Sequence, residues 1–227
     1  MERLAQMLGE YNVLQAFWMT VQLTVLGALG ALILGTIITV MRVSPVGVLN
    51  KAAAFYTNVV LYTPLTLIVF FFAFGVYIKM QLSPLPLSAP IRDHNFAMGV
   101  IAIAVYHSSL VAEALRSGIN TVPLGQAEAA RAIGLDFGQS LREVLLPQAF
   151  RGAIAPLGNT LIALCKNTTV VATVGVAEAA FLMNSMIEFY SDLLVPIFVI
   201  FATGFVVLTL PIGMVFTWWS KKAAVLR

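Results

Sequence analysis

The longest uncharged stretch of this sequence runs from Tyr11 to Met41 and contains no Lys, Arg, Asp or Glu. About 20 consecutive apolar residues are enough to cross the hydrocarbon core of a bilayer as a helix. We therefore expect this stretch to span a membrane as one helix, over roughly 17–41. Charged residues make up only 10% of the 227 residues, whereas soluble domains carry about 25%. The composition thus indicates an integral membrane protein.

Four further apolar runs predict four more transmembrane helices, over 52–78, 95–112, 150–174 and 193–219. The three prolines within 80–94 predict an irregular loop. The mixed, acidic segment 176–192 predicts a second loop, with water around Glu178, Glu188 and Asp192. Residues 1–16 lack the basic start of a cleaved signal peptide, so the first run is expected to remain as an anchor. The prediction is an all-α membrane protein with five transmembrane helices in a single domain, 1–227.

Lysine and arginine decide the predicted orientation, because they are retained on the cytosolic side of a membrane. Five spans place the two ends of the chain on opposite sides. A cytosolic C-terminus leaves three basic residues outside and nine inside. The outer residues are Arg3, Lys79 and Arg92; the inner ones are Arg42, Lys51, Arg116, Arg131, Arg142, Arg151, Lys221, Lys222 and Arg227. We therefore expect the N-terminus outside, the C-terminus in the cytosol and Lys166 within the membrane.

The most charged stretch of the chain lies between the third and fourth runs, on the cytosolic side of this topology. Pro123 suits the first turn of a short helix and Gly134 suits its end. Asp136, with Gln139 three residues later, matches a capping box for a second helix. Pro147 is expected to end that helix. The stretch is predicted to form two short helices at an angle, with an alanine-rich flank that a soluble partner can approach closely.

The spacing within this stretch resembles the EAA loop of bacterial ABC importer permeases. The family pattern is Glu-Ala-Ala, three residues, Gly, nine residues and Ile-x-Leu-Pro. This chain matches it with Glu128, Ala129, Ala130 and Gly134, followed by the segment 144–147, in which valine replaces the isoleucine. The resemblance implies that a cytosolic coupling loop over about 121–148 contacts ATPase subunits. It also implies that these four residues take part in the coupling.

Other segments resemble the permeases for polar amino acids, and most of all the glutamate-importer permeases of actinobacteria. These segments are 42–46, 64–67, 113–120, 146–151 and 166–169. The resemblance implies the type I ABC importer permease fold and three partners: a second permease, related or identical, a cytosolic ATPase dimer and an external substrate-binding protein. The expected function is ATP-driven import of a polar amino acid, glutamate first, across the bacterial cell membrane. Import of glutamine or a basic amino acid, or a channel, is the alternative.

One departure from the family pattern bears on the substrate. Relatives usually have an arginine two residues before the Thr-Pro pair of the second span, where this chain has Leu61. If that arginine handles an acidic substrate in relatives, its absence argues against glutamate here. If the arginine is structural, the substrate is unaffected.

Lys166 is the one basic residue within a predicted span, and an ionisable residue there is functional by default. Its ammonium either meets a substrate carboxylate or anchors the helix on neighbouring carbonyls. The other candidates for a polar path offer a similar choice between lining the path and bonding between helices. They are Thr63, Thr66, Asn159, Thr160 and Thr168.

The sequence lacks the motifs of an enzyme. No G-x-x-x-x-G-K-[ST] segment is present, so ATP hydrolysis is assigned to a separate subunit. His94 and His107 are not spaced as metal ligands, and no metal or cofactor is expected. His107-Ser108-Ser109 beside Glu113 can suggest a hydrolase, but a catalytic arrangement also needs an orienting group and an oxyanion site. We therefore expect a transport subunit and not an enzyme.

Overall fold

The computed structural model describes residues 2–224, and every regular element in that part of the chain is a helix. Three helices are long and apolar enough to cross a membrane singly. They are α2 (Val13–Val43), α5 (Ile91–Ile119) and α10 (Leu194–Ala224). Two bent helix pairs bring the number of crossings to five if each pair is one span. All five predicted runs therefore form helices; Arg227, which the charge argument counts as cytosolic, lies outside the described residues.

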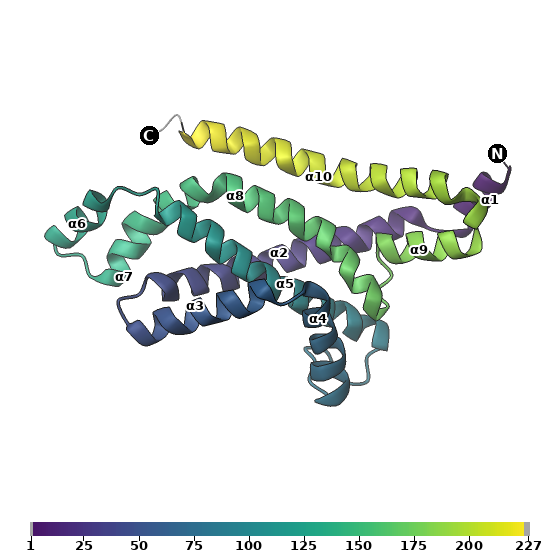
Figure 1. Ribbon diagram of the computed structural model, residues 1–227, viewed down its shortest axis with the longest axis horizontal. Helices are drawn as coiled ribbons and strands as arrows, with labels where there is room; N and C mark the ends of the chain where they lie inside the picture. The colour runs from purple at the N-terminus through teal and green to yellow at the C-terminus, as the bar shows by residue number, and fades with distance from the viewer. Residues whose placement is uncertain (1, 225–227) are drawn as a thin grey trace.

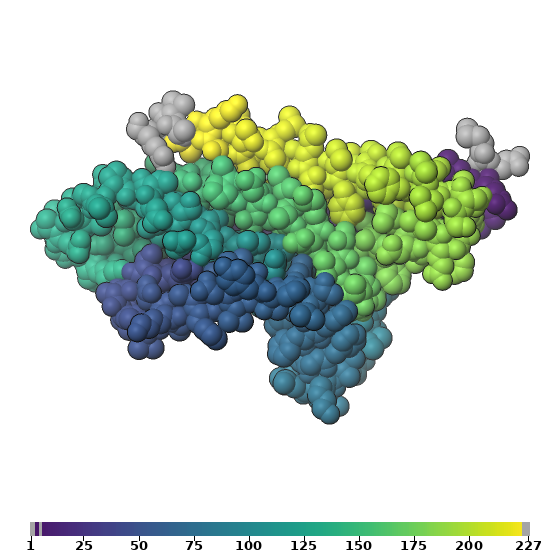
Figure 2. All heavy atoms as spheres, in the orientation of Figure 1, coloured from purple at the N-terminus to yellow at the C-terminus, as the bar shows by residue number. Residues whose placement is uncertain are grey.

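The second predicted span is not one straight helix. Two successive segments, α3 (Gly47–Tyr62) and α4 with η1 (Leu65–Phe70 and Phe71–Lys79), meet at an angle of 104°. The break falls at Thr63, whose φ of −91° and ψ of 127° are extended. The residue before a proline is driven out of the helical region by the ring that follows it, here that of Pro64. The run 52–78 is therefore not one continuous helix as expected, and α4 with η1 projects from the body as a lobe (Figure 2).

The fourth span is longer at its start than the sequence suggests, because Pro147 does not end the preceding helix. The chain stays helical from Phe137 to Val174. A π-helical segment before the proline widens the turn, and Pro147 then lies in the first turn of α8, where a missing N–H is tolerated. After Val174 the direction changes by 56°. The elements in order are α7 (Phe137–Gln139), η2 (Ser140–Leu145), α8 (Leu146–Asn167), η3 (Thr168–Val174) and α9 (Ala179–Phe189).

The core is formed by α2, α5 and α8, and α5 packs on both of the others. Small residues allow this close packing: a Cβ on Gly118 of α5 would lie 2.2 Å from the carbonyl oxygen of Ala149 in α8. Buried aliphatic residues such as Leu23, Ile103 and Leu164 fill the space between the three helices. α10 packs on α8 but keeps most of its surface exposed, which suits a helix at the edge facing lipid or another subunit.

The two ends of the long axis differ in content. The charged stretch, with α6 (Leu124–Ala132) and α7, lies at one end, and α10 finishes in the same half of the molecule (Figure 1). The other end holds an N-terminal helix, α1 (Glu2–Glu10), together with α9 and the short η4 (Ser191–Leu193). α1 is joined there by the ion pair of Arg3 with Asp192 at 2.8 Å and by the buried Met7. This helix was not predicted from the sequence.

The acidic segment near this end corrects another expectation. Glu178 is fully buried, not in water. Its carboxylate caps α9, accepting hydrogen bonds from the N–H groups of Ala180 and Phe181, both at 2.9 Å. The hydroxyl of Thr20 in α2 donates to the same carboxylate at 3.4 Å and accepts from the N–H of Ala179 at 3.1 Å. Glu178 therefore ties the start of α9 to the first span, whereas Glu188 and Asp192 are exposed as expected.

Candidate coupling surface and substrate path

The end of α6 has the geometry that the sequence predicted. Gly134 adopts a φ of +88°, the left-handed conformation that glycine enters without steric cost. Its N–H donates to the carbonyl of Arg131 at 3.0 Å, and the next N–H, of Leu135, donates to the carbonyl of Ala130 at 3.1 Å. This pair of bonds is a Schellman motif. The chain therefore reverses at Gly134, and α6 begins at Leu124, one residue after Pro123.

The second short helix begins with the predicted capping box. The Asp136 carboxylate accepts from the N–H of Gln139 at 2.8 Å, and the Gln139 side chain accepts from the N–H of Asp136 at 3.0 Å. Two N–H groups that a helix start leaves unpaired are thereby satisfied. The two-helix arrangement is confirmed, with the second helix continuing directly into the fourth span.

The alanines of this coupling segment have different environments. Glu128 and Ala129 are exposed, whereas Ala130 is only 3% exposed. α6 packs on η2, so the small side chain at position 130 serves contact within the chain. Glu128 and Ala129 are the members of the motif that a partner can reach. Gly134 is also exposed, and a Cβ built on it meets no atom within 4 Å, so any close contact there must come from another subunit.

Sequence reasoning missed three apolar side chains at this end of the molecule. Leu124 is 83% exposed, Ile133 is 77% exposed and Phe137 is 41% exposed. Large apolar side chains gathered on a polar segment mark a surface that is covered in a complex. The sequence could have indicated these exposed side chains, because they lie next to Pro123, Gly134 and Asp136. A solvated loop would carry polar residues at such positions.

A charged network lies where this end meets the spans. The Glu113 carboxylate on α5 receives Arg42 of α2 at 2.5 Å through one oxygen and Arg116 at 2.6 Å through the other. The side-chain amide of Asn50, in α3, donates to the carbonyl of Arg42. Three spanning segments are thus joined at the same level, and a displacement of one will be resisted by the others.

The same contacts remove the hydrolase interpretation. Glu113 is engaged by arginines, and the hydroxyls of Ser108 and Ser109 donate to carbonyl oxygens of their own helix at 2.7 and 2.6 Å. The Nδ1 atom of His107 lies 2.9 Å from the carbonyl oxygen of Ile103. No nucleophile and base are paired within this group.

His107 instead reaches α8. Its Nε2 atom lies 3.2 Å from the side-chain amide nitrogen of Asn167, which can donate when Nδ1 carries the ring proton. His107 is fully buried. A polar contact between α5 and α8 therefore lies directly next to Lys166 in the sequence. The only sequence signal for this contact between His107 and Asn167 is that Asn167 lies next to Lys166.

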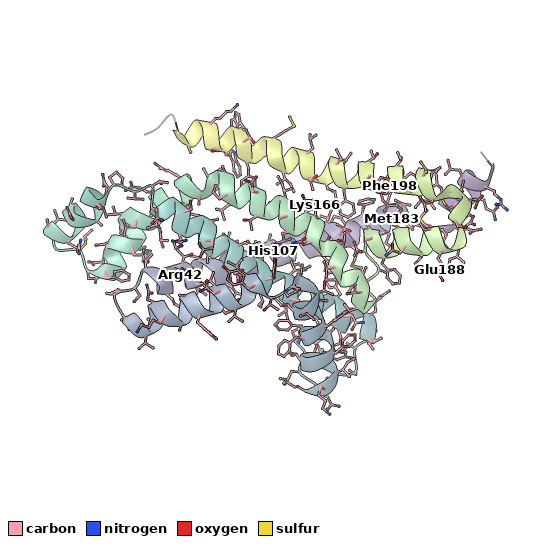
Figure 3. The ribbon with its side chains drawn as sticks, in the orientation of Figure 1. Arg42, His107, Lys166, Met183, Glu188 and Phe198 are labelled. Carbon is pink, nitrogen blue, oxygen red and sulfur yellow. The ribbon has the colours of Figure 1, made fainter. Side chains whose placement is uncertain are left out.

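Two of the predicted path residues lie on one open face of α8. Asn159 and Lys166 are seven positions apart, about two helical turns, and both are exposed. Lys166 lies between α8 and α10 in the view of Figure 3. Within residues 2–224, no hydrogen bond or ion pair to its ammonium group is found. The chain therefore leaves a charged, polar face of its fourth span uncovered.

The threonines have other environments. The hydroxyls of Thr63, Thr160 and Thr168 donate to carbonyls of Val59, Pro156 and Cys165, at 2.7, 3.0 and 2.8 Å. These are bonds within one segment and not between helices.

Thr66 and Thr168 belong to α4 and η3, which pack together, and Thr63 lies at the bend just before α4. Thr160 lines an apolar cavity. The structure therefore places the bend near the end of α8, and it separates Thr160 from the open face that carries Asn159 and Lys166.

Comparisons with known proteins agree with this arrangement. A model of the family "Binding-protein-dependent transport system inner membrane component" matches residues 27–224. The glutamate transport system permease protein GluC of Corynebacterium efficiens is 50% identical over 94% of this chain and 95% of its own. The probable glutamine ABC transporter permease GlnM of Bacillus subtilis is 30% identical over 92% of both chains.

A solved structure of an amino acid ABC transporter with histidines superposes with a TM-score of 0.77 at 26% identity, covering 92% of this chain and 93% of that one. The family match, over residues 27–224, includes the coupling segment. This chain therefore belongs to the family of binding-protein-dependent transport system inner membrane components, and it is the permease subunit of an ABC importer.

Proposed function

We propose that the substrate of this importer is glutamate. The observation that supports this assignment is the 50% identity to a glutamate transport permease over nearly the whole of both chains. That match contains the coupling segment, the bend of the second span and the end of the fourth, so it is not confined to the apolar framework. The open Lys166 supplies a cation that an acidic substrate can meet, whereas a basic amino acid would be repelled by it.

The path itself requires a second permease subunit. Asn159 and Lys166 are exposed on their own chain, and a lysine facing hydrocarbon costs roughly 2.5–3.5 kcal/mol on insertion scales. A second permease, identical or related, that places its own fourth span opposite would enclose both polar faces in one path. Thr63, Thr66 and Thr168, at the bend and the end of α8, are then candidates for one mouth of that path.

The energy comes from a cytosolic ATPase dimer that docks on the coupling segment. Glu128, Ala129 and Gly134, with the apolar Leu124 and Ile133, form the surface that it contacts. Closure of the ATPases on ATP moves this end, and the helix that runs without interruption from Phe137 to Val174 carries the motion into the membrane. An external binding protein delivers the substrate at the end formed by α1 and α9. ATP shifts the equilibrium between the inward-open and outward-open states only because it binds the two states with different affinities.

Uptake measurements test the assignment. The permease, expressed with its ATPase and binding-protein partners in cells without glutamate uptake, should import labelled glutamate. Excess unlabelled glutamate should compete better than glutamine or arginine. Preferred import of arginine or glutamine would overturn the substrate and make Leu61 the clue to specificity. Import that continues when the ATPase is inactivated would indicate a channel instead.

A further inference from the structure

The membrane-facing side of the molecule has a groove that the transport function leaves unexplained. Two cavities, of about 370 Å³ and 430 Å³, lie between α2, α8 and α10. They share Ala28, Leu32 and Leu161, so they form one continuous groove along the helices. It extends from Val21 and Leu208, in the outer half, to Arg151 near the coupling end.

The walls of this groove suit an apolar occupant. The hydroxyls of its threonines are already used: Thr24 donates to the carbonyl of Thr20 at 2.8 Å, and Thr160 donates to that of Pro156 at 3.0 Å. The remaining lining is aliphatic or aromatic apart from Cys165 and the last residue, Arg151. An amino acid would lose its hydration here without gaining hydrogen bonds, so the groove is not part of the substrate path.

The coupling end of the groove changes character abruptly. Arg151 lines both the apolar groove and a more polar pocket of about 340 Å³ beyond it, which Gln126 and Gln148 also line. Arg151 is exposed and takes part in no ion pair within the described chain. Trp219, at the edge of the groove, is the residue type that favours the level of lipid headgroups. An apolar groove that ends at a cation and two amide side chains is complementary to an amphiphile, which has an apolar chain and a polar headgroup.

We propose that this groove holds one acyl chain of an anionic phospholipid whose phosphate binds Arg151. From Arg151 to Cys165, α8 rises about 21 Å at about 1.5 Å per residue. That length accommodates a chain from one leaflet, which is half of a hydrocarbon core of about 30 Å. The guanidinium pairs with phosphate oxygens in bidentate fashion, and Gln126 and Gln148 can donate to the rest of the headgroup. The lipid links α10 to the coupling segment through Gln126 of α6.

Lipid retention by the complete, purified importer tests the proposal. Native mass spectrometry should count more bound phosphatidylglycerol than phosphatidylcholine when both are offered in equal amounts. Arg151→Gln, on an exposed side chain, should reduce that preference about fivefold per site, the factor expected from losing one basic residue at an anionic surface. Lys51→Gln removes an exposed charge at another place and should leave the preference unchanged.

A second variant separates the groove from the charge. Ala28→Phe fills the space shared by the two cavities and should also reduce phosphatidylglycerol retention, although the net charge is unaltered. An unchanged preference in Arg151→Gln would overturn the proposal. So would cross-linking of a cysteine at Ile212, a groove residue of α10, to the same position of a second permease, because a protein would then cover the groove.

Discussion

The role of Lys166 depends on whether its ammonium group has partners within the chain. A charge in a span is expensive, and most such residues are paired within their own chain. Here the ammonium is exposed while the neighbouring Asn167 makes the contact with buried His107. The anchoring interpretation would require carbonyl acceptors around Lys166, and none is found within residues 2–224. The role of meeting a substrate carboxylate stays a prediction.

Replacing Lys166 with methionine should abolish that interaction and keep the length of the side chain. A hydrogen bond to a charged group contributes roughly 1.5–3 kcal/mol, so glutamate uptake per assembled complex should fall about tenfold or more. Basal ATP hydrolysis and the amount of complex should stay the same. Lys51→Met, at an exposed position of α3, is the control. A loss of complex with full normalised uptake would restore the anchoring interpretation.

Glu178 caps the start of α9 and Glu188 lies in its last turn, so their substitutions should have different effects. Glu178→Ala removes the acceptor for the first N–H groups of α9 and should lower the free energy of unfolding by roughly 1–3 kcal/mol. Glu188 is exposed, and its side chain points away from the body (Figure 3), so Glu188→Ala should have little effect. Thermal denaturation of the detergent-solubilised complex measures both. Equal melting temperatures would contradict the capping role.

Among the elements, those defined by local chemistry were predictable and those defined by packing were not. The Gly134 turn and the Asp136 capping box need only residues within five positions of each other, and both have the predicted geometry. A proline such as Pro147 is a local signal for the end of a helix. Here the chain stays helical, because a π-helical segment precedes Pro147 and the proline lies in the first turn of α8. Pro64 does break its helix. Whether a proline breaks or continues a helix depends on the surrounding helices, which spacing along the chain does not reveal.

The turn at Gly134 can be tested by two substitutions of different size. Both Gly134→Ala and Gly134→Leu place a side chain at positive φ, which costs about 1–2 kcal/mol. Within the chain, the Cβ that both substitutions add meets no atom within 4 Å. If an ATPase contacts this point, leucine alone should weaken ATPase attachment further. Gly47→Leu, equally open and without a positive φ, is the control. Equal ATPase binding by both Gly134 variants would place the contact elsewhere.

The exposed Ile133 gives a second test of the coupling surface. Burying an apolar side chain of this size contributes roughly 1.5–3 kcal/mol, so Ile133→Asn should weaken ATPase attachment about tenfold or more. Leu87→Asn changes an equally apolar, exposed residue in the loop before α5 and should leave attachment unchanged. Co-purification of the ATPase with each variant distinguishes them. Full attachment of the Ile133 variant would exclude this face.

At the scale of the whole molecule, the apolar runs that form the candidate spans could be predicted from their length and spacing, because hydrocarbon thickness leaves few alternatives. The lobe of α4 and η1, the helix α1 and the lipid groove could not be predicted, since each depends on which helices become neighbours. Asn159 and Lys166 could each be named as path candidates from the sequence, because each is a polar residue within an apolar run. The position of Thr160 away from their face could not be predicted, because it depends on which side of α8 packs against the other helices.

The orientation can be measured directly. A cysteine at Ser88, in the irregular loop before α5, should react with a membrane-impermeant reagent added to whole cells. A cysteine at Ala127 in α6 should react only after the inner face is opened. The native Cys165 is buried and should contribute little to either signal. The reverse order of labelling would place the coupling segment outside.

The uncovered face of α8 also has a consequence for the supply of the subunit in the cell. A permease copy that finds no partner keeps Lys166 and Asn159 against lipid. Such a copy is poorly matched to a bilayer, because a charged and a polar side chain face hydrocarbon. Surplus chains should therefore be removed quickly, so that the abundance of this permease follows that of its partners and not its own rate of synthesis.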